Sequence, residues 1–156
     1  MTMPLHLAND AADKLAVIDA LYRFAAGIDL RDSSLLSSAL AENAVSDFRP
    51  AAAKAGFDYP VIAGRDRIVA ALAASLAKLD TTHSVTNPRV AIDGDTARLD
   101  ALVEAQHVSQ DDPARSYLMK NRYDVELERK GDGWVIKRNT VDNVWRAGDI
   151  AVLSAI

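Results

Sequence analysis

The sequence predicts an α+β fold in which helices come first and long antiparallel strands follow. Apolar residues recur at helical spacing before Thr81 and at alternate positions from Thr81 onward. Two tight-turn signals, Asp93-Gly94 and Gly131-Asp132-Gly133, each separate two strand-like runs. The chain has 156 residues and no internal repeat or linker, so residues 1–156 are expected to form a single domain.

Three helices are expected before the strands. The first spans Asp13 to Leu30, and a short second helix begins after Ser33 and runs to about Leu40. An alanine-rich third helix spans Arg65 to Leu79. Residues 43–62 look irregular, with a short strand at residues 45–48 followed by proline and glycine as breakers. The stripe of the first helix that is expected to face the core consists of Leu15, Ile18, Leu21, Tyr22, Ala25 and Ile28.

Four strand-like runs follow, at residues 82–92, 96–109, 116–130 and 134–146. An antiparallel sheet commonly has only one face in water, so the apolar face of each run must cover a core or a cavity. His107 lies on that face of the second run, and Tyr117, Asn121 and Tyr123 lie on that face of the third. Polar groups that converge between apolar walls are typical of a small-molecule pocket.

Composition excludes several classes of partner and chemistry. The formal net charge is −4 and no Lys/Arg cluster is present, which argues against binding to nucleic acid or to a membrane surface. The absence of cysteine removes disulfides and thiolate chemistry. Residues 1–9 do not resemble a signal peptide and no apolar run has membrane-spanning length, so a cytoplasmic protein is expected.

Asp29 is the residue that says most about chemistry. It falls on the apolar stripe, seven residues after Tyr22 and four after Ala25. A carboxylate that faces a core is costly unless a partner neutralises it, and His83, in a strand-like run, is the candidate partner. The alternative is that Asp29 caps residues 31–40 or lies in water at the helix end.

Other catalytic chemistries lack their motifs. No glycine-rich phosphate loop or dinucleotide fingerprint is present, and Ser84 has no nucleophile-elbow context. Neither His83 nor His107 has a short-spaced second ligand of the zinc type, so neither a metal nor another cofactor is predicted. Proton transfer by a carboxylate–imidazole pair remains, and it needs no cofactor.

Motifs over nearly the whole chain resemble a known family. They are LYRFAAGIDLRD at 21–32, ALAENAV at 39–45, GRD at 64–66, THSVTN at 82–87 and GWVI at 133–136. Together they resemble the SnoaL-like, nuclear transport factor 2-like superfamily, and within it the branch of scytalone dehydratase, bile acid 7α-dehydratase and hexachlorocyclohexane dehydrochlorinase. The resemblance implies a cone-shaped, curved mixed sheet wrapped around a cavity and closed by the N-terminal helices.

The resemblance also implies roles for individual residues. Asp29 and His83 match the catalytic aspartate and histidine of the branch. His107 is placed similarly to a second active-site histidine, and Asn121 more loosely to a strand asparagine. Arg138 resembles an arginine of the dehydrochlorinase, although the hairpin spacing differs.

One position departs from the family pattern. Phe24 stands five residues before the aspartate, where members often carry a tyrosine or a lysine. A tyrosine from elsewhere is then expected to supply the missing polar group. The residues expected to contact substrate are Tyr22, Phe24, Phe57, Tyr59, Tyr117, Asn121, Tyr123 and Arg138.

The function expected from these observations is that of a cofactor-free lyase, a dehydratase for a flat apolar substrate of aromatic, polyketide or steroid-like type. His83, oriented by Asp29, would take a proton, and a tyrosine, His107 or a water would stabilise the oxyanion and protonate the leaving hydroxide. Two alternatives stay open: an isomerase or cyclase with the same base, and a non-catalytic binding protein or small subunit of a ring-hydroxylating dioxygenase.

Two further expectations concern surfaces. The resemblance implies a homo-oligomer, a trimer in preference to a dimer, formed through the outer face of the sheet. That face is expected to carry Leu102, Val108, Leu118, Val135, Val141 and Trp145. The apolar tail after Gly148 is expected to cover the mouth of the pocket beside Phe57 and Tyr59, the alternative being that it packs on the sheet exterior or a neighbouring subunit.

Overall fold

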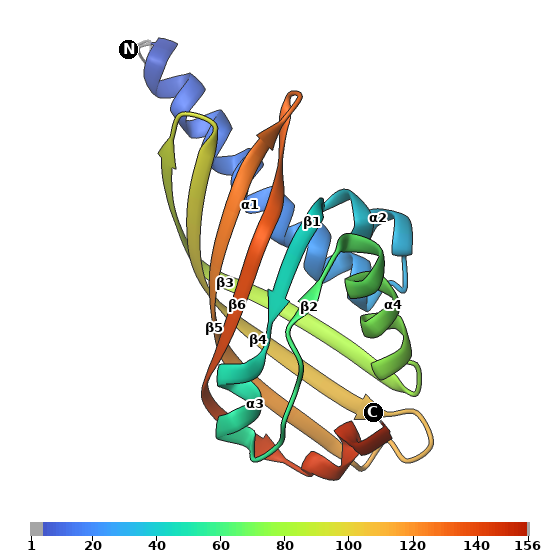
Figure 1. Cartoon of the computed structure of the whole chain (residues 1–156). Helices are drawn as coiled ribbons and strands as arrows, with labels where there is room; N and C mark the ends of the chain where they lie inside the picture. Colours follow the sequence, from blue (N-terminus) through green and yellow to red (C-terminus); the bar gives the residue numbers. More distant parts are fainter. Residues whose placement is uncertain (1–4, 156) are drawn as a thin grey trace.

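The computed structural model describes residues 5–155 and confirms the α+β class (Figure 1). The elements in chain order are α1 (Leu5–Asp29), α2 (Ser33–Ser38), β1 (Leu40–Asp47), α3 (Arg49–Ala55), β2 (Ile62–Ala63), α4 (Arg65–Ser75), β3 (Leu79–Asp93), β4 (Thr96–Ser109), β5 (Ser116–Lys130), β6 (Gly133–Gly148) and the 3₁₀ helix η1 (Ile150–Ala155). Within these residues, no helix combines the length and the apolar character that crossing a bilayer requires.

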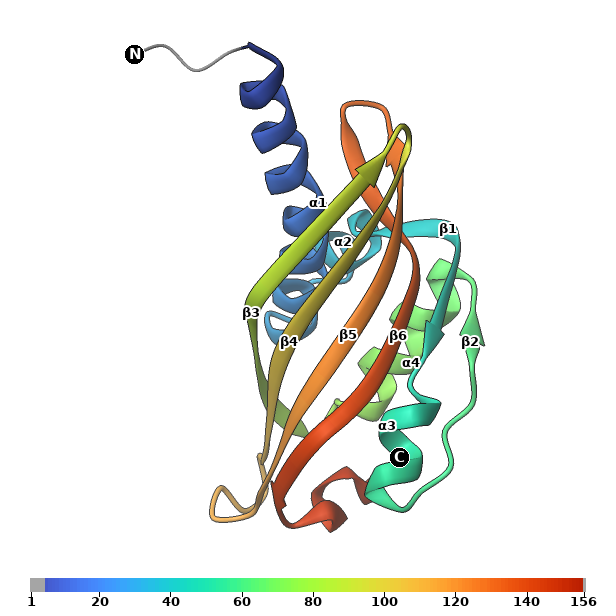
Figure 2. The same cartoon turned by 90° about the vertical axis from the view of Figure 1, so that its left-hand side faces the viewer.

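The sheet is mixed and has six strands in the order β2-β1-β6-β5-β4-β3. β1 runs parallel to β6, and every other neighbouring pair is antiparallel. The long strands curve, and helices α1, α2 and α4 lie together on one side of them (Figure 2). This is the predicted arrangement of a curved sheet closed by the N-terminal helices.

Helix α1 buries only part of the predicted stripe: Leu21, Ala25 and Ile28 are buried and Ile18 packs against the core. The helix begins at Leu5 rather than Asp13 and ends at Asp29. Its fully buried positions include Val17 and Leu21, whereas Leu15 and Tyr22 are 67% and 48% exposed. The helix carries apolar residues on several sides, so the direction of burial is set by the sheet that it packs on and not by the sequence pattern alone.

The end of α1 is held close to α2. A Cβ atom on Gly27 would lie 2.6 to 2.8 Å from the backbone and Cβ of Leu36, so only glycine allows this approach. Asp32 then caps α2, because its side chain accepts a hydrogen bond of 2.9 Å from the amide of Leu35. The alternative in which Asp29 caps this segment is therefore wrong.

The stretch expected to be irregular contains more structure than the sequence indicated. Strand β1 begins at Leu40, where the second helix was expected to end, and continues to Asp47. Helix α3 follows, with Pro50 in its first turn and Gly56 as a left-handed C-cap at φ +88°. Helix α4 ends at Ser75, and β3 already begins at Leu79, where the third helix was expected to end.

Strands β4 and β5 have the predicted bounds, and their predicted inward faces are buried. Strand β6 departs from simple alternation. Leu127 pairs with Ile136 and Glu126 with Arg138, so Lys137 is an extra residue that reverses the inward parity. Val141 consequently points inward and is buried, contrary to the expectation that it lies on the outer face. Val135 pairs with Glu128 on the outward side of β5, but it is buried as well.

Candidate active site

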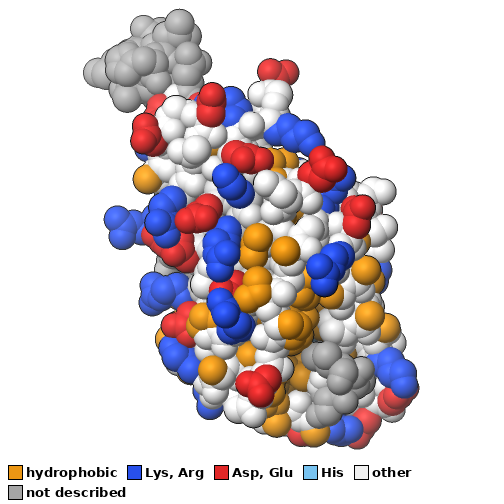
Figure 3. Space-filling view, in the orientation of Figure 1, with side chains coloured by type: hydrophobic (Ala, Val, Ile, Leu, Met, Phe, Trp, Pro, Cys, Tyr) orange, Lys and Arg blue, Asp and Glu red, His pale blue; other side chains and the backbone are white. Residues whose placement is uncertain are grey.

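A cavity lies between the curved sheet and the helices that cover it. Hydrophobic side chains predominate in its wall, and no Asp, Glu, Lys or Arg of the described residues lines it. Hydrophobic side chains also gather on the surface over the region of β2 and α4 (Figure 3). The lining residues are Phe24, Ile28, Ser46, Phe48, Phe57, Tyr59, Ile62, Ile68, Leu72, Ser75, Leu76, His83, Ala105, His107, Met119, Asn121, Tyr123, Asn139, Val141 and Leu153.

Asp29 and His83 form the predicted contact. Asp29 ends α1, and β3 brings His83 to it: Oδ1 of Asp29 lies 2.6 Å from Nδ1 of His83. The other carboxylate oxygen accepts a 2.7 Å hydrogen bond from the backbone amide of His83, and Thr81 donates its hydroxyl to Oδ1 at 3.0 Å. The His83 side chain is only 7% exposed and lines the cavity, with Asp29 behind it.

The electrostatic environment of Asp29 determines which of the two side chains carries the proton of their hydrogen bond. Burial alone would raise the pKa of Asp29, but the hydrogen bonds from His83 and Thr81 outweigh it and lower this pKa below its usual value. The ionised carboxylate can only accept, so Nδ1 of His83 carries the proton that faces it. In the neutral ring Nε2 is then a free base.

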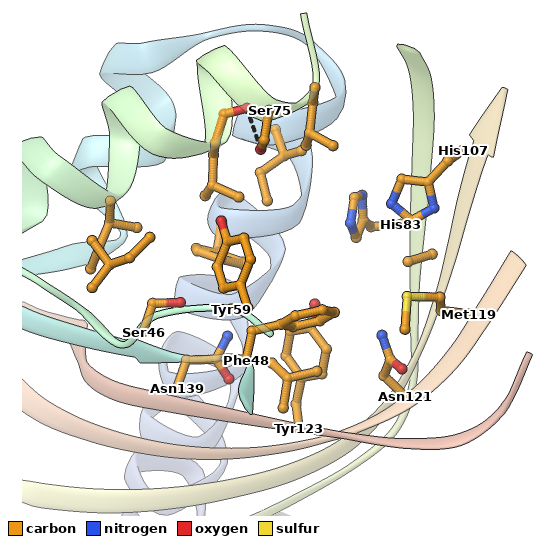
Figure 4. Close-up of a pocket in the computed structure, with 18 of the residues that line it drawn as sticks. Ser46, Phe48, Tyr59, Ser75, His83, His107, Met119, Asn121, Tyr123 and Asn139 are labelled. Atoms are coloured by element: carbon orange, nitrogen blue, oxygen red, sulfur yellow. Dashed lines mark hydrogen bonds between the residues drawn. The ribbon is translucent and has the colours of Figure 1, made fainter. Parts of the chain in front are cut away.

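His107 lies beside His83 but has a different chemical character. The two rings are 6.2 Å apart and nearly perpendicular (Figure 4). Burial lowers the pKa of His107 to about 4, so the ring is neutral at pH 7. Its Nδ1 donates to the backbone oxygen of Tyr117 at 3.1 Å, which leaves Nε2 as an acceptor. The expectation that His107 protonates a leaving hydroxide does not fit this arrangement.

Asn121 is oriented by a second asparagine. Nδ2 of Asn143 lies near the backbone oxygens of Lys120 and Trp145 and donates to Oδ1 of Asn121 at 2.9 Å. The backbone oxygens of Lys120 and Trp145 can only accept hydrogen bonds, so the side-chain atom of Asn143 beside them must be the nitrogen. The atom of Asn121 that accepts from this nitrogen is therefore Oδ1. The amide nitrogen of Asn121 is therefore left to donate on the cavity side (Figure 4).

Aromatic side chains form much of the wall. Phe48 packs edge-on against Tyr59, with ring centroids 5.7 Å apart, and lies 6.3 Å from the ring of Phe57. Burial raises the pKa of Tyr123 far above its ordinary value, so its hydroxyl stays protonated and can donate. Of the residues expected to contact substrate, Phe24, Phe57, Tyr59, Asn121 and Tyr123 line the cavity.

Three predicted contact residues lie elsewhere. Tyr22 is 48% exposed, because the buried face of α1 is rotated away from it. Tyr117 is buried but does not line the cavity, although its backbone orients His107. Arg138 forms an ion pair with Asp47 at 3.0 Å and is also outside the lining.

Several lining residues were not predicted as contacts. Met119 lies on an inward face that the alternation already identified, and Phe48 ends the short strand that the sequence indicated. For Ser46 and Asn139, no pattern in the sequence indicated a position in the cavity wall. Asn139 points inward only because of the extra residue Lys137, which a period-two pattern does not encode.

The C-terminal tail reaches the cavity. Helix η1 packs on β4 and β5, and its residues Val152 and Leu153 are buried. Leu153 lines the cavity together with Phe57 and Tyr59. The tail therefore lies beside these two aromatic residues, as expected, and its role as a lid stays a prediction.

Comparisons with known proteins agree with this fold. Terrestric acid biosynthesis cluster protein E of Penicillium crustosum is 34% identical over 157 residues, which cover 96% of this chain and 95% of that protein. The structure of the Kfla4162 protein of Kribbella flavida superposes with a TM-score of 0.80 at 25% identity, over 94% of this chain and 99% of that one. A candidate scytalone dehydratase of Novosphingobium aromaticivorans shares the fold with a TM-score of 0.78 at 14% identity, over 92% and 91% of the two chains.

The resemblance to the SnoaL-like family, stated from the sequence motifs, is confirmed. The SnoaL-like domain family matches residues 9–140, which include Asp29, His83, His107 and Asn121. The cone-shaped mixed sheet with its N-terminal helices is the nuclear transport factor 2-like, or cystatin-like, fold. The chain belongs to the SnoaL-like domain family.

Proposed function

We propose that this protein is a cofactor-free lyase, a dehydratase that removes water from a flat, mostly apolar β-hydroxy carbonyl compound. The observation that carries the proposal is the connected pair of Asp29 and His83, whose 2.6 Å contact leaves a free base at the wall of an apolar cavity. A protein that only stores a ligand does not need such a pair. The kinship with a biosynthesis-cluster protein of Penicillium crustosum supports a role in making a small molecule.

The first step is proton abstraction. Nε2 of His83 takes the proton from the carbon next to the carbonyl, and Asp29 stabilises the imidazolium that forms. The electron pair of the broken C–H bond moves toward the carbonyl oxygen, which becomes an enolate. The donors available at the cavity wall for this oxygen are the amide nitrogen of Asn121 and the hydroxyl of Tyr123.

The second step expels the hydroxyl group. As the carbonyl re-forms, the new carbon–carbon double bond forms and the C–O bond breaks. The imidazolium of His83 returns its proton to the departing oxygen, so that one water leaves and His83 is again neutral. Nε2 of His107 can accept a hydrogen bond from a hydroxyl group of the substrate.

An isomerase or cyclase is the second candidate, because it would use the same base. Phe24 favours it, since this position offers no polar group to assist a leaving hydroxide. The two reactions differ in their products. An isomerase or cyclase keeps the mass of the substrate, whereas a dehydratase lowers it by one water.

The test is the conversion of 3-hydroxy-1-tetralone, a bicyclic β-hydroxy ketone, to 1-naphthol and water. We expect the wild-type protein to accelerate it and His83→Gln to reduce the rate to the buffer background. Tyr123→Phe should slow the reaction, while Tyr22→Phe, at an exposed tyrosine of α1, should not. A rate that His83→Gln leaves unchanged would refute the proposal, and a product of unchanged mass would favour the second candidate.

A further inference from the structure

The end of the cavity away from the histidines has a polar pair of its own, formed by Ser46 and Asn139. The two residues are register partners on the parallel strands β1 and β6, and both line the cavity. In Figure 4 they lie on the opposite side of the cavity from His83 and His107.

Asn139 is buried without a protein partner for its side-chain oxygen. The residue is 2% exposed, and among the described residues no donor lies within hydrogen-bond reach of Oδ1. A buried amide that lacks a partner is destabilising, and native proteins rarely keep one without a reason. The extra residue Lys137 turns this amide into the cavity, where simple alternation along β6 would have pointed it outward.

We infer that Ser46 and Asn139 form a second polar subsite that binds a neutral hydroxyl group at the far end of the substrate. An amide and a serine hydroxyl together both donate and accept, which is what an alcohol or phenol hydroxyl requires. A charged group is not favoured, because no Asp, Glu, Lys or Arg of the described residues lines the cavity.

The aromatic wall adds a constraint on the substrate. Phe48, Tyr59 and Tyr123 lie between the two polar ends (Figure 4). A matching ligand is a flat apolar scaffold with polar groups at opposite ends, one for the histidines and one for Ser46 and Asn139. In naming this substrate class for the elimination the inference rests on the proposed function, but the subsite itself can be tested by binding alone.

Three probes measure the subsite without turnover: naphthalene, 2-naphthol and naphthalene-2,6-diol, whose affinities are measured by calorimetry. The second hydroxyl should make the diol bind the wild-type protein about tenfold more tightly than 2-naphthol. Asn139→Leu should bring the ratio of the two affinities close to one, and Ser46→Ala should reduce it in the same direction. The controls are Asn43→Leu and Ser84→Ala, which change the same residue types at exposed positions and should keep the wild-type ratio.

Thermal unfolding provides a second readout. Leucine has the same number and branching of side-chain heavy atoms as asparagine and no polar group to satisfy, and its larger methyl groups can extend into the cavity, so Asn139→Leu should unfold at the same or a higher temperature than wild type. A purely structural asparagine would give a lower unfolding temperature with an unchanged affinity ratio, and that result would overturn the inference. If Asn139→Leu does not fold, the ratio measured with Ser46→Ala decides.

The two proposals fail separately. His83→Gln should keep the preference for the diol, because it leaves the far end of the cavity intact. If the tetralone is not dehydrated but the diol preference depends on Asn139, the subsite stands and the proposed reaction does not. A wild-type protein that binds the diol no better than 2-naphthol, or binds neither, overturns the subsite whatever the reaction.

Discussion

The carboxylate of Asp29 contacts His83 twice, through Nδ1 of the ring at 2.6 Å and through the backbone amide at 2.7 Å. The first contact fixes the tautomer of the imidazole, and the second fixes the strand that carries it. Asp29 is the last residue of α1, so this contact joins the end of the helix to β3 at His83, the proposed catalytic base. The pair is thus both a structural link and the element that prepares Nε2 of His83 as a base.

Thr81→Val should weaken the orientation of Asp29 without changing the shape of the site. The substitution removes the hydroxyl that donates to Oδ1 at 3.0 Å. We expect the free energy of unfolding to fall by about 1 kcal/mol and the dehydration rate by up to about tenfold. Thr86→Val is the control, because it removes a 3.1 Å hydrogen bond to the backbone of Leu102 at an exposed position. Equal rates in Thr81→Val and wild type would show that Thr81 does not position the carboxylate.

His107 should make the protein less stable in mild acid. Its pKa in the folded state is about 4, below the ordinary value of 6.5, because burial disfavours the charged ring. As the pH falls from 6.5 to about 4, the unfolded chain binds a proton that the folded chain does not, and the free energy of unfolding falls by up to about 3 kcal/mol. The lowered pKa of Asp29 acts in the same direction, but only below its usual value of 3.8.

The measurement is denaturant unfolding at about pH 7 and about pH 4.5. His107→Asn can keep the hydrogen bond to the Tyr117 carbonyl but does not titrate. This variant should lose most of the dependence on pH that wild type shows in that interval. A variant with the same pH dependence as wild type would mean that His107 is not the group responsible.

Comparing Leu153→Ala with Val152→Ala shows whether η1 closes the cavity or only packs against the sheet. Both residues of η1 are buried, but only Leu153 lines the cavity. Each truncation should lower the free energy of unfolding, by about 1 to 4 kcal/mol. Only Leu153→Ala, and deletion of the residues after Gly148, should also weaken the binding of 2-naphthol or slow dehydration. Equal effects of the two substitutions on binding would leave the tail a purely structural element.

The outer face of the sheet should hold the protein in an oligomer, a trimer in preference to a dimer. Trp145 of β6 pairs with Lys120 on the outward side of β5 and is 48% exposed, and large exposed apolar side chains are commonly covered by a partner. Light scattering should give three times the monomer mass, and Trp145→Lys should shift the protein toward monomers. A monomer mass for wild type throughout a dilution series would rule this assembly out.

The parts of the fold that local sequence encodes were predictable. The bounds of β4 and β5 follow from alternation between tight-turn signals, and these strands carry His107, Asn121 and Tyr123 inward as expected. The Asp29–His83 contact was predicted from the helix position of Asp29 and from family motifs. Its length of 2.6 Å is that of a hydrogen bond.

The remaining features depend on tertiary packing. Helical spacing places Tyr22 on the expected stripe of α1, but the way in which the helix packs on the sheet leaves it exposed. Asn139 could not be assigned to the cavity, because an extra residue at Lys137 reverses the parity of β6 and has no signature in the local sequence. Neither outcome follows from a periodic pattern.

The most direct test of the central claim is deuterium exchange into 1-tetralone, which has acidic protons next to its carbonyl and no group to eliminate. The protein is incubated with the ketone in D₂O, binding is checked by ligand-observed NMR in the same sample, and exchange at the carbon next to the carbonyl is followed by NMR. The wild-type protein should exchange these protons well above the buffer rate, and Asp29→Asn and His83→Gln should reduce the exchange toward that rate. Exchange by bound wild-type protein no faster than in buffer, or as fast in His83→Gln as in wild type, would contradict the assignment of His83 as the base.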